Sequence, residues 1–434
     1  MAIALEPDVG VAIAEDAVQR ALQAGATASK ASHCYRERYE VNFDTDGVSL
    51  VRSTVNDSLS VTAYSGDRKG SSEMTGRDHD GVDTTVSQAL EAARASEPDP
   101  ANVLPDAGSA PATNGGDQEP DSEAMVDAVA SFVESLRRQH PSILSRSSSY
   151  SFVNVWDSYA NSRGRTQHAR RSHYQVSFVL AGRNEKASTS FQYCTVASGS
   201  PVADFSDMDG IRQSIAETEE SFGASPVPET FVGDVILTPQ ACAALISSVV
   251  TSLSGLALMK KTTPFLDRLG DRIASPKFTL AHRPSTLAGA AAFDNEGFPN
   301  VDLGVVTAGV LESFIVDWYM SHKLNRPMTT GETDIEVSPG DTDFDDIVAA
   351  TERGIVMGRY SGGTPNQSLD FSGVAKNSFY VEDGKVVHPI NETMVAGNLA
   401  SLLTNINAVS RQQIDYGSFR MPWVSAGGVT ISTK

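Results

Sequence analysis

Residues 239–259 read PQACAALISSVVTSLSGLALM and contain no charged side chain. The stretch is long enough to cross a bilayer, but its apolar residues recur at the spacing of one helical face. That face comprises Cys242, Leu245, Ile246, Val249, Val250, Leu253, Leu256 and Ala257. Thr238 can cap the amino end, and Pro239 suits the first helical position. We therefore expect a helix over 238–259 that buries this face and presents small hydroxyl side chains on the other.

The chain as a whole is strongly acidic. Its 434 residues include 54 acidic and 34 basic side chains, which give a formal net charge of −20. This length predicts at least two domains, and the negative field disfavours nucleic acid and anionic membranes as partners. The three cysteines form no disulfide framework, and the amino terminus shows no secretory signal. We expect a cytoplasmic protein with neither a nucleic-acid nor a membrane partner.

The patterns of strands and helices divide the chain near the proline-containing stretch 222–230. Strands interrupted by isolated helices, without regular alternation, favour the α+β class. We expect an N-terminal mixed α/β layer domain over 1–225 and a C-terminal strand-rich, barrel-like domain over 226–434. Residues 97–122 are rich in Pro, Gly, Asp and Ala and nearly lack large apolar residues, which predicts a flexible insertion within the first domain.

Standard catalytic signatures are missing from the sequence: it has no GxSxG, Walker A, HExxH or helix-opening GxGxxG motif. His168 and His173 would face opposite sides of a strand, so we do not expect them to share a metal. The basic run 163–174 fits a charged strand edge or an anion site equally well. Asp294 and Glu296 favour a turn, with Asp294 accepting backbone N–H groups, over a catalytic carboxylate pair. From these residues alone, the chain lacks a complete catalytic machinery.

Four segments occur in a distinctive order: ANSRGR (160–165), FLDRLGDRIASP (265–276), FDNEGFP (293–299) and FSGVAKNSFYVEDGKVVHPINETMVAGNL (371–399). Their order and spacing resemble the TldD/PmbA family over nearly the whole chain, apart from 97–122. The resemblance implies an α+β N-terminal domain followed by a strand-rich C-terminal domain. The family contains two kinds of subunit. TldD-type chains hold zinc through a helical HExxxH motif and a later cysteine, whereas PmbA (TldE)-type chains lack both and pair with the first type in a heterodimeric metallopeptidase.

In this resemblance, LISSVVTSLSG (245–255) takes the place of the HExxxH helix. Aligning the shared Leu253 and Gly255 puts three residues where His, Glu and His would stand: Ile246, Ser247 and Thr251. A shift by one residue gives Ser247, Ser248 and Ser252 instead. Neither set contains a zinc ligand, and no cysteine follows Cys242. The resemblance therefore implies a PmbA (TldE)-type chain with no catalytic residue, metal ligand or cofactor of its own, and zinc in its partner.

We expect this chain to pair with a TldD-like zinc-binding subunit and to complete a chamber in which peptides are processed. Candidate chamber residues are Ser247, Ser248, Thr251, Ser361, Gly362, Gly363, Gly373, Lys376 and Asn377. Packing within the domain or a subunit contact explains each of them equally well. Two alternatives stay open: a subunit of a specialised peptidase or amidase acting on a secondary-metabolite intermediate, and a homodimeric binding or scaffold protein without enzymatic activity.

Overall fold

The computed structural model describes residues 7–76, 78–110, 113–331 and 334–433. Two sheets dominate these residues, one on each side of the loop before Phe231. The N-terminal sheet contains β1 (Ala28–Asp44), β2 (Gly47–Ser65), β3 (Arg68–Thr75), β4 (Thr113–Gly115), β5 (Ile143–Asn161), β6 (Thr166–Gly182) and β7 (Gln192–Ser198). Its order is β3-β2-β1-β5-β6-β4, with β7 added on β6. The predicted α+β class is confirmed.

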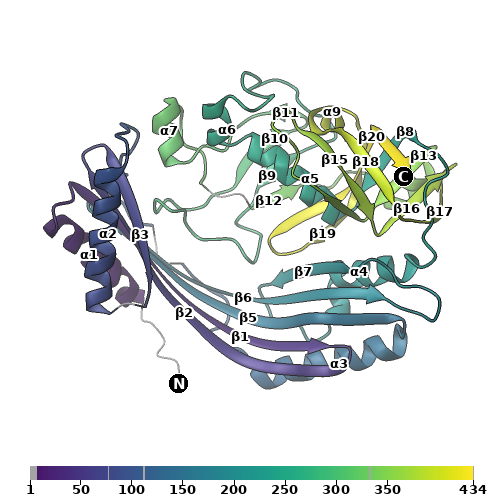
Figure 1. The fold of residues 1–434 in the computed structure, drawn as a ribbon, viewed down its shortest axis with the longest axis horizontal. Helices are drawn as coiled ribbons and strands as arrows, with labels where there is room; N and C mark the ends of the chain where they lie inside the picture. The colour runs from purple at the N-terminus through teal and green to yellow at the C-terminus, as the bar shows by residue number, and fades with distance from the viewer. Residues whose placement is uncertain (1–6, 77, 111–112, 332–333, 434) are drawn as a thin grey trace.

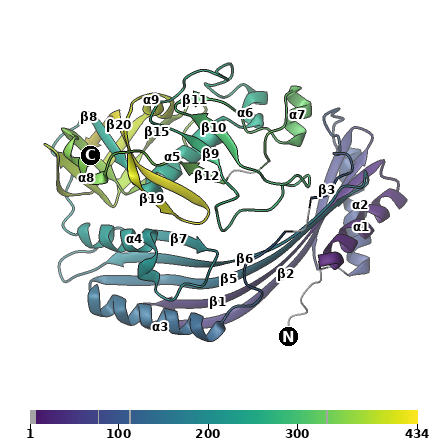
Figure 2. The same cartoon turned by 180° about the vertical axis from the view of Figure 1, so that it is seen from behind.

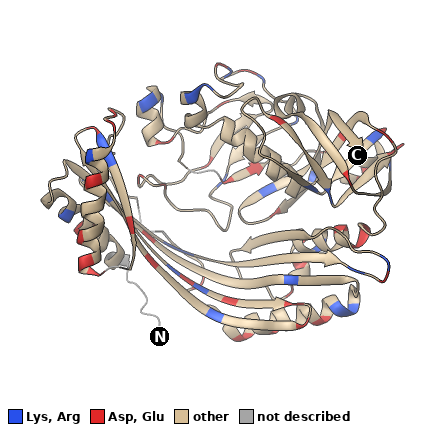
Figure 3. Cartoon of the chain, viewed as in Figure 1, with Lys and Arg blue, Asp and Glu red and all other residues tan. Residues whose placement is uncertain are grey.

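The N-terminal sheet is built from long strands, and helices cover it at both ends (Figure 1). The helices are α1 (Pro7–Gln23), α2 (His79–Ala95), α3 (Ser122–Gln139) and α4 (Asp209–Glu220). Small residues of α1 and α2 pack on one end of the strands. At the other end, α3 covers an aromatic cluster in which Phe43, Phe132, Phe178 and Phe205 lie within contact of one another. Acidic and basic residues both occur along these helices and strands (Figure 3).

The second sheet forms the C-terminal domain. It contains β8 (Phe231–Leu237), β9 (Leu280–His282), β10 (Leu303–Thr307), β11 (Val310–Leu311), β12 (Ile335–Val337), β13 (Arg353–Met357), β14 (Arg359–Gly362), β15 (Asp370–Lys376), β16 (Ser378–Glu382), β17 (Lys385–Ile390), β18 (Thr393–Asn398), β19 (Ile406–Asp415) and β20 (Phe419–Thr433). Among the described strands the sheet is open and branched, which corrects the barrel-like expectation. Because β20 changes partners along its length, from β12 and β19 to β8 and β18, the sheet divides there instead of closing.

The uncharged stretch 239–259 forms two helices, α5 (Pro239–Ser252) and α6 (Gly255–Lys260), where one was expected. Thr238 caps α5 as predicted, with its hydroxyl oxygen 3.4 Å from the amide of Ala241. The apolar face is buried as far as Leu253, but Leu256 is 45% exposed. The helix breaks where the backbone bonds to a distant segment instead: the Gly255 amide donates to the Ile315 carbonyl at 2.7 Å, and the Leu253 carbonyl accepts from the Ile315 amide at 3.0 Å. Among the described helices, none combines the length and apolarity needed to cross a membrane.

Three further helices complete the C-terminal domain: α7 (Trp318–Leu324), α8 (Phe344–Ala349) and α9 (Leu399–Thr404). The first of them contacts the segment 97–122, which differs from the flexible insertion expected from composition. The Trp318 indole donates to the Val103 carbonyl at 2.7 Å, and Asp99 accepts from the Tyr319 hydroxyl at 2.6 Å. Leu104 is only 2% exposed. The described part of this segment therefore joins the two domains.

The C-terminal domain also contacts the N-terminal strands near Lys30. The Lys30 ammonium lies 2.6 Å from a Glu296 carboxylate oxygen, and both side chains are largely buried. Arg165 donates to the Gly297 carbonyl at 3.3 Å and covers the ring of Phe298. The predicted turn is confirmed, because one Asp294 oxygen accepts the amides of Glu296 and Phe298, both at 2.9 Å. The loop 293–300 is therefore an inter-domain contact.

A second contact lies near the far end of the same strands (Figures 1 and 2). The Asn377 amide donates to Gln192 at 2.8 Å, and Gln192 in turn donates to Glu217 at 2.8 Å. Gln213 donates to the other Glu217 oxygen at 3.0 Å. Burial raises the pKa of Glu217 to about 7. From Thr166 to Leu180, which pairs with Gln192, β6 covers about 46 Å of extended chain, so the two contacts are far apart.

We expect Lys30→Met to lower the free energy of unfolding by about 2–3 kcal/mol. The substitution leaves the Glu296 carboxylate largely buried without its countercharge. The shift in urea midpoint, compared with wild type, measures the effect. Arg268→Met is the control, because it breaks an exposed pair with Asp271 and should cost no more than about 0.5 kcal/mol. Equal losses for the two variants would contradict this assignment.

Glu217→Gln tests the second contact through pH. A carboxyl whose pKa is raised on folding holds its proton more tightly in the folded protein, so stability falls as pH rises from 4.5 to about 7. The fall attributable to Glu217 is on the order of 3 kcal/mol. The free energy of unfolding of the glutamine variant minus that of wild type should therefore increase from pH 5 to pH 8, as measured by urea unfolding. Parallel pH dependences of the two proteins would refute a buried, titrating Glu217.

Candidate functional site

The hydroxyl face of α5 is the first candidate site. Ser247 and Thr251 are exposed, and Ser248 is half-buried. The Ser247 hydroxyl donates to the Ala244 carbonyl at 2.8 Å, and Thr251 donates to the Ser247 carbonyl at 2.9 Å. Their protons are thus held by the backbone of the helix itself. Because no acid or base stands beside them on α5, these hydroxyls form a neutral surface without an activated nucleophile.

The hydroxyl face is shared between two cavities. Ser247 lines a cavity of about 440 Å³, which we call the α5–β7 cavity. Ser248 and Thr251 line a smaller one, of about 170 Å³, together with residues 364–367 and Leu369. The structure therefore separates candidate residues that the sequence placed on one wall.

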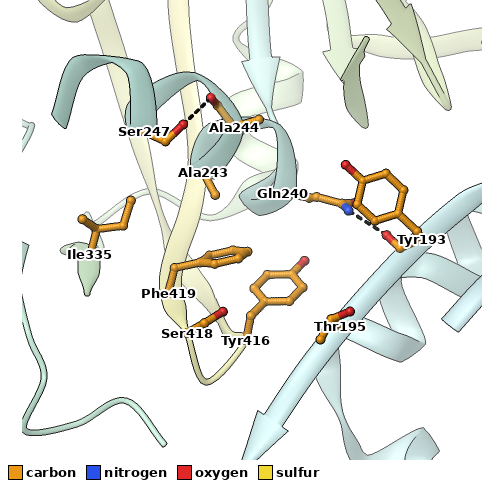
Figure 4. Close-up of a pocket in the computed structure, with 10 residues that line it drawn as sticks. All are labelled: Tyr193, Thr195, Gln240, Ala243, Ala244, Ser247, Ile335, Tyr416, Ser418 and Phe419. Carbon is orange, nitrogen blue, oxygen red and sulfur yellow. Dashed lines mark hydrogen bonds between the residues drawn. The ribbon is translucent and has the colours of Figure 1, made fainter. Parts of the chain in front are cut away.

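The α5–β7 cavity lies between the two domains (Figure 4). Its lining residues are Tyr193, Thr195, Gln240, Ala243, Ala244, Ser247, Ile335, Tyr416, Ser418 and Phe419. The Gln240 amide donates to the Tyr193 carbonyl at 2.6 Å and so joins α5 to β7. The rings of Tyr416 and Phe419 stack with centroids 4.6 Å apart. None of the ten lining residues carries a charge.

The turn between β19 and β20 sets the shape of this cavity. Gly417 has a φ of 78°, and a Cβ there would lie 2.3 Å from the Ala197 carbonyl oxygen. The Ala197 amide donates to the Tyr416 carbonyl at 2.8 Å. Only glycine allows this close approach of the turn to β7. The turn thereby holds Tyr416 and Phe419 opposite α5.

The glycine candidates serve internal packing. Gly362 and Gly373 pair across β14 and β15, and a Cβ at Gly373 would lie 2.6 Å from the ring of Tyr360. The Tyr360 hydroxyl donates to the Ser372 carbonyl at 3.0 Å. The paired glycines thus make room for an aromatic ring that covers them, an arrangement that also stabilises designed sheets.

The remaining candidates do not line either cavity. Ser361 and Lys376 are partly exposed on the β14–β15 hairpin, and a Cβ at Gly363 would meet no atom within 4 Å. Asn377 is 5% exposed, and its side chain belongs to the contact with Gln192. The structure therefore brings only Ser247, among the nine candidates, into the α5–β7 cavity.

The zinc that the family resemblance implies for TldD-type chains does not fit α5. Cys242 is the only Cys, His, Asp or Glu on this helix, and it faces the core, where burial raises its pKa to about 12. Ser247 and Thr251 offer hydroxyl oxygens in place of imidazole or thiolate, which zinc prefers. Over the described ranges, no group of three or more His, Cys, Asp or Glu could hold a metal ion.

The basic run and the two histidines also have structural roles. Arg163 pairs with Asp106 at 3.0 Å, and Arg171 pairs with Asp157. The guanidinium of Arg170 donates to the Asp117 carbonyl. The arginines therefore satisfy carboxylates and carbonyls, several of them in the segment 97–122. His168 faces Ser158, with 3.1 Å between the ring Nδ1 and the hydroxyl, whereas burial lowers the pKa of His173 to about 4.

Sequence reasoning missed most of the α5–β7 cavity. Tyr193 and Thr195 come from β7, while Tyr416, Ser418 and Phe419 come from a turn more than 200 residues later. The one local signal is the glycine at 417 between two aromatic residues, which marks a tight turn with an apolar surface. Nothing in the sequence places that turn opposite α5.

Comparison with known proteins agrees with the geometry. The family described as PmbA/TldA metallopeptidase C-terminal domain matches residues 230–433. Metalloprotease PmbA of Escherichia coli O157:H7 is 25% identical over 413 residues, covering 91% of this chain and 88% of the relative. The Metalloprotease PmbA homolog of Haemophilus influenzae is 25% identical over 453 residues, covering 95% and 94%. The crystal structure of TldE from Thermococcus kodakarensis shares the fold, with a TM-score of 0.84, 18% identity, and coverage of 97% of this chain and 100% of that one. The C-terminal domain of this chain, residues 230–433, therefore belongs to the PmbA/TldD family of metallopeptidases.

Proposed function

We propose that this chain is the non-metal subunit of a TldD/TldE-type heterodimeric zinc peptidase. One observation carries the proposal: α5, which in the family resemblance takes the place of the HExxxH helix, has no His, Cys, Asp or Glu on its accessible face, where Gln240, Ala244 and small hydroxyl side chains lie. The hydroxyls of Ser247 and Thr251 are bonded to the helix backbone, so they offer neither metal ligands nor a base. Zinc and the activated water would come from a TldD-like partner.

In this proposal the chain contributes the wall of a peptide-processing chamber. A neutral face of small side chains on α5 lets an extended peptide approach closely, because α5 carries no charged side chain that could repel a charge on the peptide. The two inter-domain contacts hold α5 opposite β7 and so keep that wall in one position. Enclosure by a second subunit would exclude water and strengthen electrostatic interactions at the partner's metal.

An exposed strand edge supports the need for a partner chain. Residues 48–56 of β2 are all exposed, because β3 pairs only with residues 58–65 and no other described strand covers the outer side. Four large aliphatic residues lie in this stretch: Val48, Leu50, Val51 and Val55. Arg52 is the only charge there, and it pairs with Glu40 at 2.9 Å. Long, apolar, unpaired edges attract another strand, so we assign this edge to the subunit contact.

The first test is activity of the reconstituted pair. A TldD-like chain with an intact HExxxH motif is mixed with this chain, and cleavage of unstructured peptides is followed by mass spectrometry. We expect cleavage by the mixture, none by either chain alone, and loss of cleavage when a chelator removes zinc. A mixture that binds but cleaves only non-peptide amide conjugates would support a specialised amidase subunit. An active chain without any partner would refute the proposal.

The second test is the effect of charge on the β2 edge. We expect the double variant Val51→Lys/Val55→Lys to weaken association with the TldD-like chain by at least about tenfold, because lysines at an edge oppose strand addition. Val232→Lys is the control, since Val232 is 69% exposed on β8, away from this edge. Light scattering after size exclusion measures the complex. Unchanged association of the double variant would contradict the assignment, and a stable homodimer that ignores the TldD-like chain would favour the scaffold alternative.

A further inference from the structure

We infer that the α5–β7 cavity is a binding pocket for an uncharged aromatic side chain of the peptide substrate. That the occupant is part of a peptide substrate rests on the proposed function, whereas the pocket and its chemistry belong to this chain alone. The cavity of about 440 Å³ is within the size range of small-ligand pockets, which concentrate where domains meet. It spans both domains, because β7 belongs to the first and α5 and the β19–β20 turn to the second.

The lining selects against charge. The chain carries a net charge of −20, yet none of the ten residues around this cavity is ionisable except two tyrosines. A charged group entering it would lose water without gaining a countercharge. Ala243 and Ala244 of α5 leave room where larger side chains would fill the space, and Ile335 and Phe419 add apolar walls.

The rings in the lining favour an aromatic occupant. Tyr416 and Phe419 form a stacked pair, and Tyr193 stands across the cavity with half of its surface exposed. Figure 4 shows the rings of Tyr416 and Phe419 below Ala243 of α5, with the Tyr193 ring to one side, beside Gln240. Aromatic rings stabilise one another by offset or edge contacts at centroid distances of about 4.5–7 Å. An aromatic side chain between them could contact rings on two sides, which an aliphatic chain cannot match.

Tyr416 adds a hydrogen-bond donor to the pocket. The residue is only 4% exposed, and its hydroxyl makes no hydrogen bond to any residue that the structure describes. Burial raises its pKa well above the ordinary value, so the hydroxyl keeps its proton. An amide carbonyl of a bound peptide is a neutral acceptor that would satisfy this donor without bringing a charge into the cavity.

Ser247 connects the pocket to the proposed chamber. It lines the cavity on one side, and in the family resemblance it stands where the helix of a TldD-type chain has its glutamate or, in the register shifted by one residue, its first histidine. A side chain held in the cavity would therefore bring the adjoining peptide backbone alongside α5. The pocket would then choose which residue of a substrate is presented, while the partner's zinc cleaves it.

Binding of neutral amino-acid amides to the purified full-length chain tests the inference. The probes are N-acetyl-L-tryptophanamide, N-acetyl-L-leucinamide and N-acetyl-L-lysinamide, titrated by calorimetry and by saturation-transfer NMR. We expect saturable binding of the tryptophanamide, binding of the leucinamide weaker by about tenfold, and none of the lysinamide. Ala244→Trp fills the pocket and should abolish binding of the tryptophanamide. Leu256→Trp, an equally bulky change at an exposed position of α6 outside both cavities, should leave it within about twofold.

Tyr416→Phe tests the donor separately. The substitution should weaken binding of the tryptophanamide by several-fold, because one hydrogen bond is lost. The order of affinity among the three probes should stay unchanged. The inference is overturned if no probe binds saturably, if the lysinamide binds as well as the tryptophanamide, or if Leu256→Trp reduces binding as much as Ala244→Trp. Probe binding without cleavage by the reconstituted pair would refute the proposed function alone, whereas cleavage without probe binding would refute the pocket alone.

Discussion

The attachment of the C-terminal domain at two distant places on the N-terminal domain, one on β1 and one at β7 and α4, determines where α5 lies. At one place a largely buried lysine–glutamate pair joins Lys30 to Glu296. At the other place the Asn377 amide donates to Gln192, whose own amide donates to the buried carboxyl of Glu217. Each contact matches polar groups that would be costly to leave unpaired away from water. The two contacts therefore fix the position of one domain relative to the other and keep α5 opposite β7.

The fold could be predicted from the sequence where local chemistry decides it. The cap at Thr238, the buried face of α5 and the turn at Asp294 all follow from side chains close in sequence. The contacts of segment 97–122 could not be predicted from nearby residues. Its carbonyls accept hydrogen bonds from side chains such as Trp318 and Asn161, which lie far away in the chain. The break before Gly255 depends on backbone hydrogen bonds with Ile315, another distant residue.

The candidate site likewise has features that residues close in sequence decide and features that depend on distant contacts. The lack of zinc ligands on α5 is visible in the sequence, since only Cys242 belongs to a ligand type, and its position on the apolar face predicts its burial. Strand pairing places Gly362 and Gly373 against the ring of Tyr360, a packing role that the sequence does not show, and their place in a chamber wall stays a prediction. The α5–β7 cavity depends wholly on how three separate segments pack together, and no periodicity or motif in the sequence predicts that packing.

We propose that this chain, which keeps the family fold without the metal ligands of TldD-type chains, is one part of a two-chain enzyme. Metal stoichiometry of the isolated complex tests this most directly. Native mass spectrometry of this chain purified together with a TldD-like partner should give one chain of each kind and a single zinc ion. Gas-phase dissociation should release this chain free of metal. Zinc retained on this chain, or a zinc-bound homodimer of it, would contradict the account.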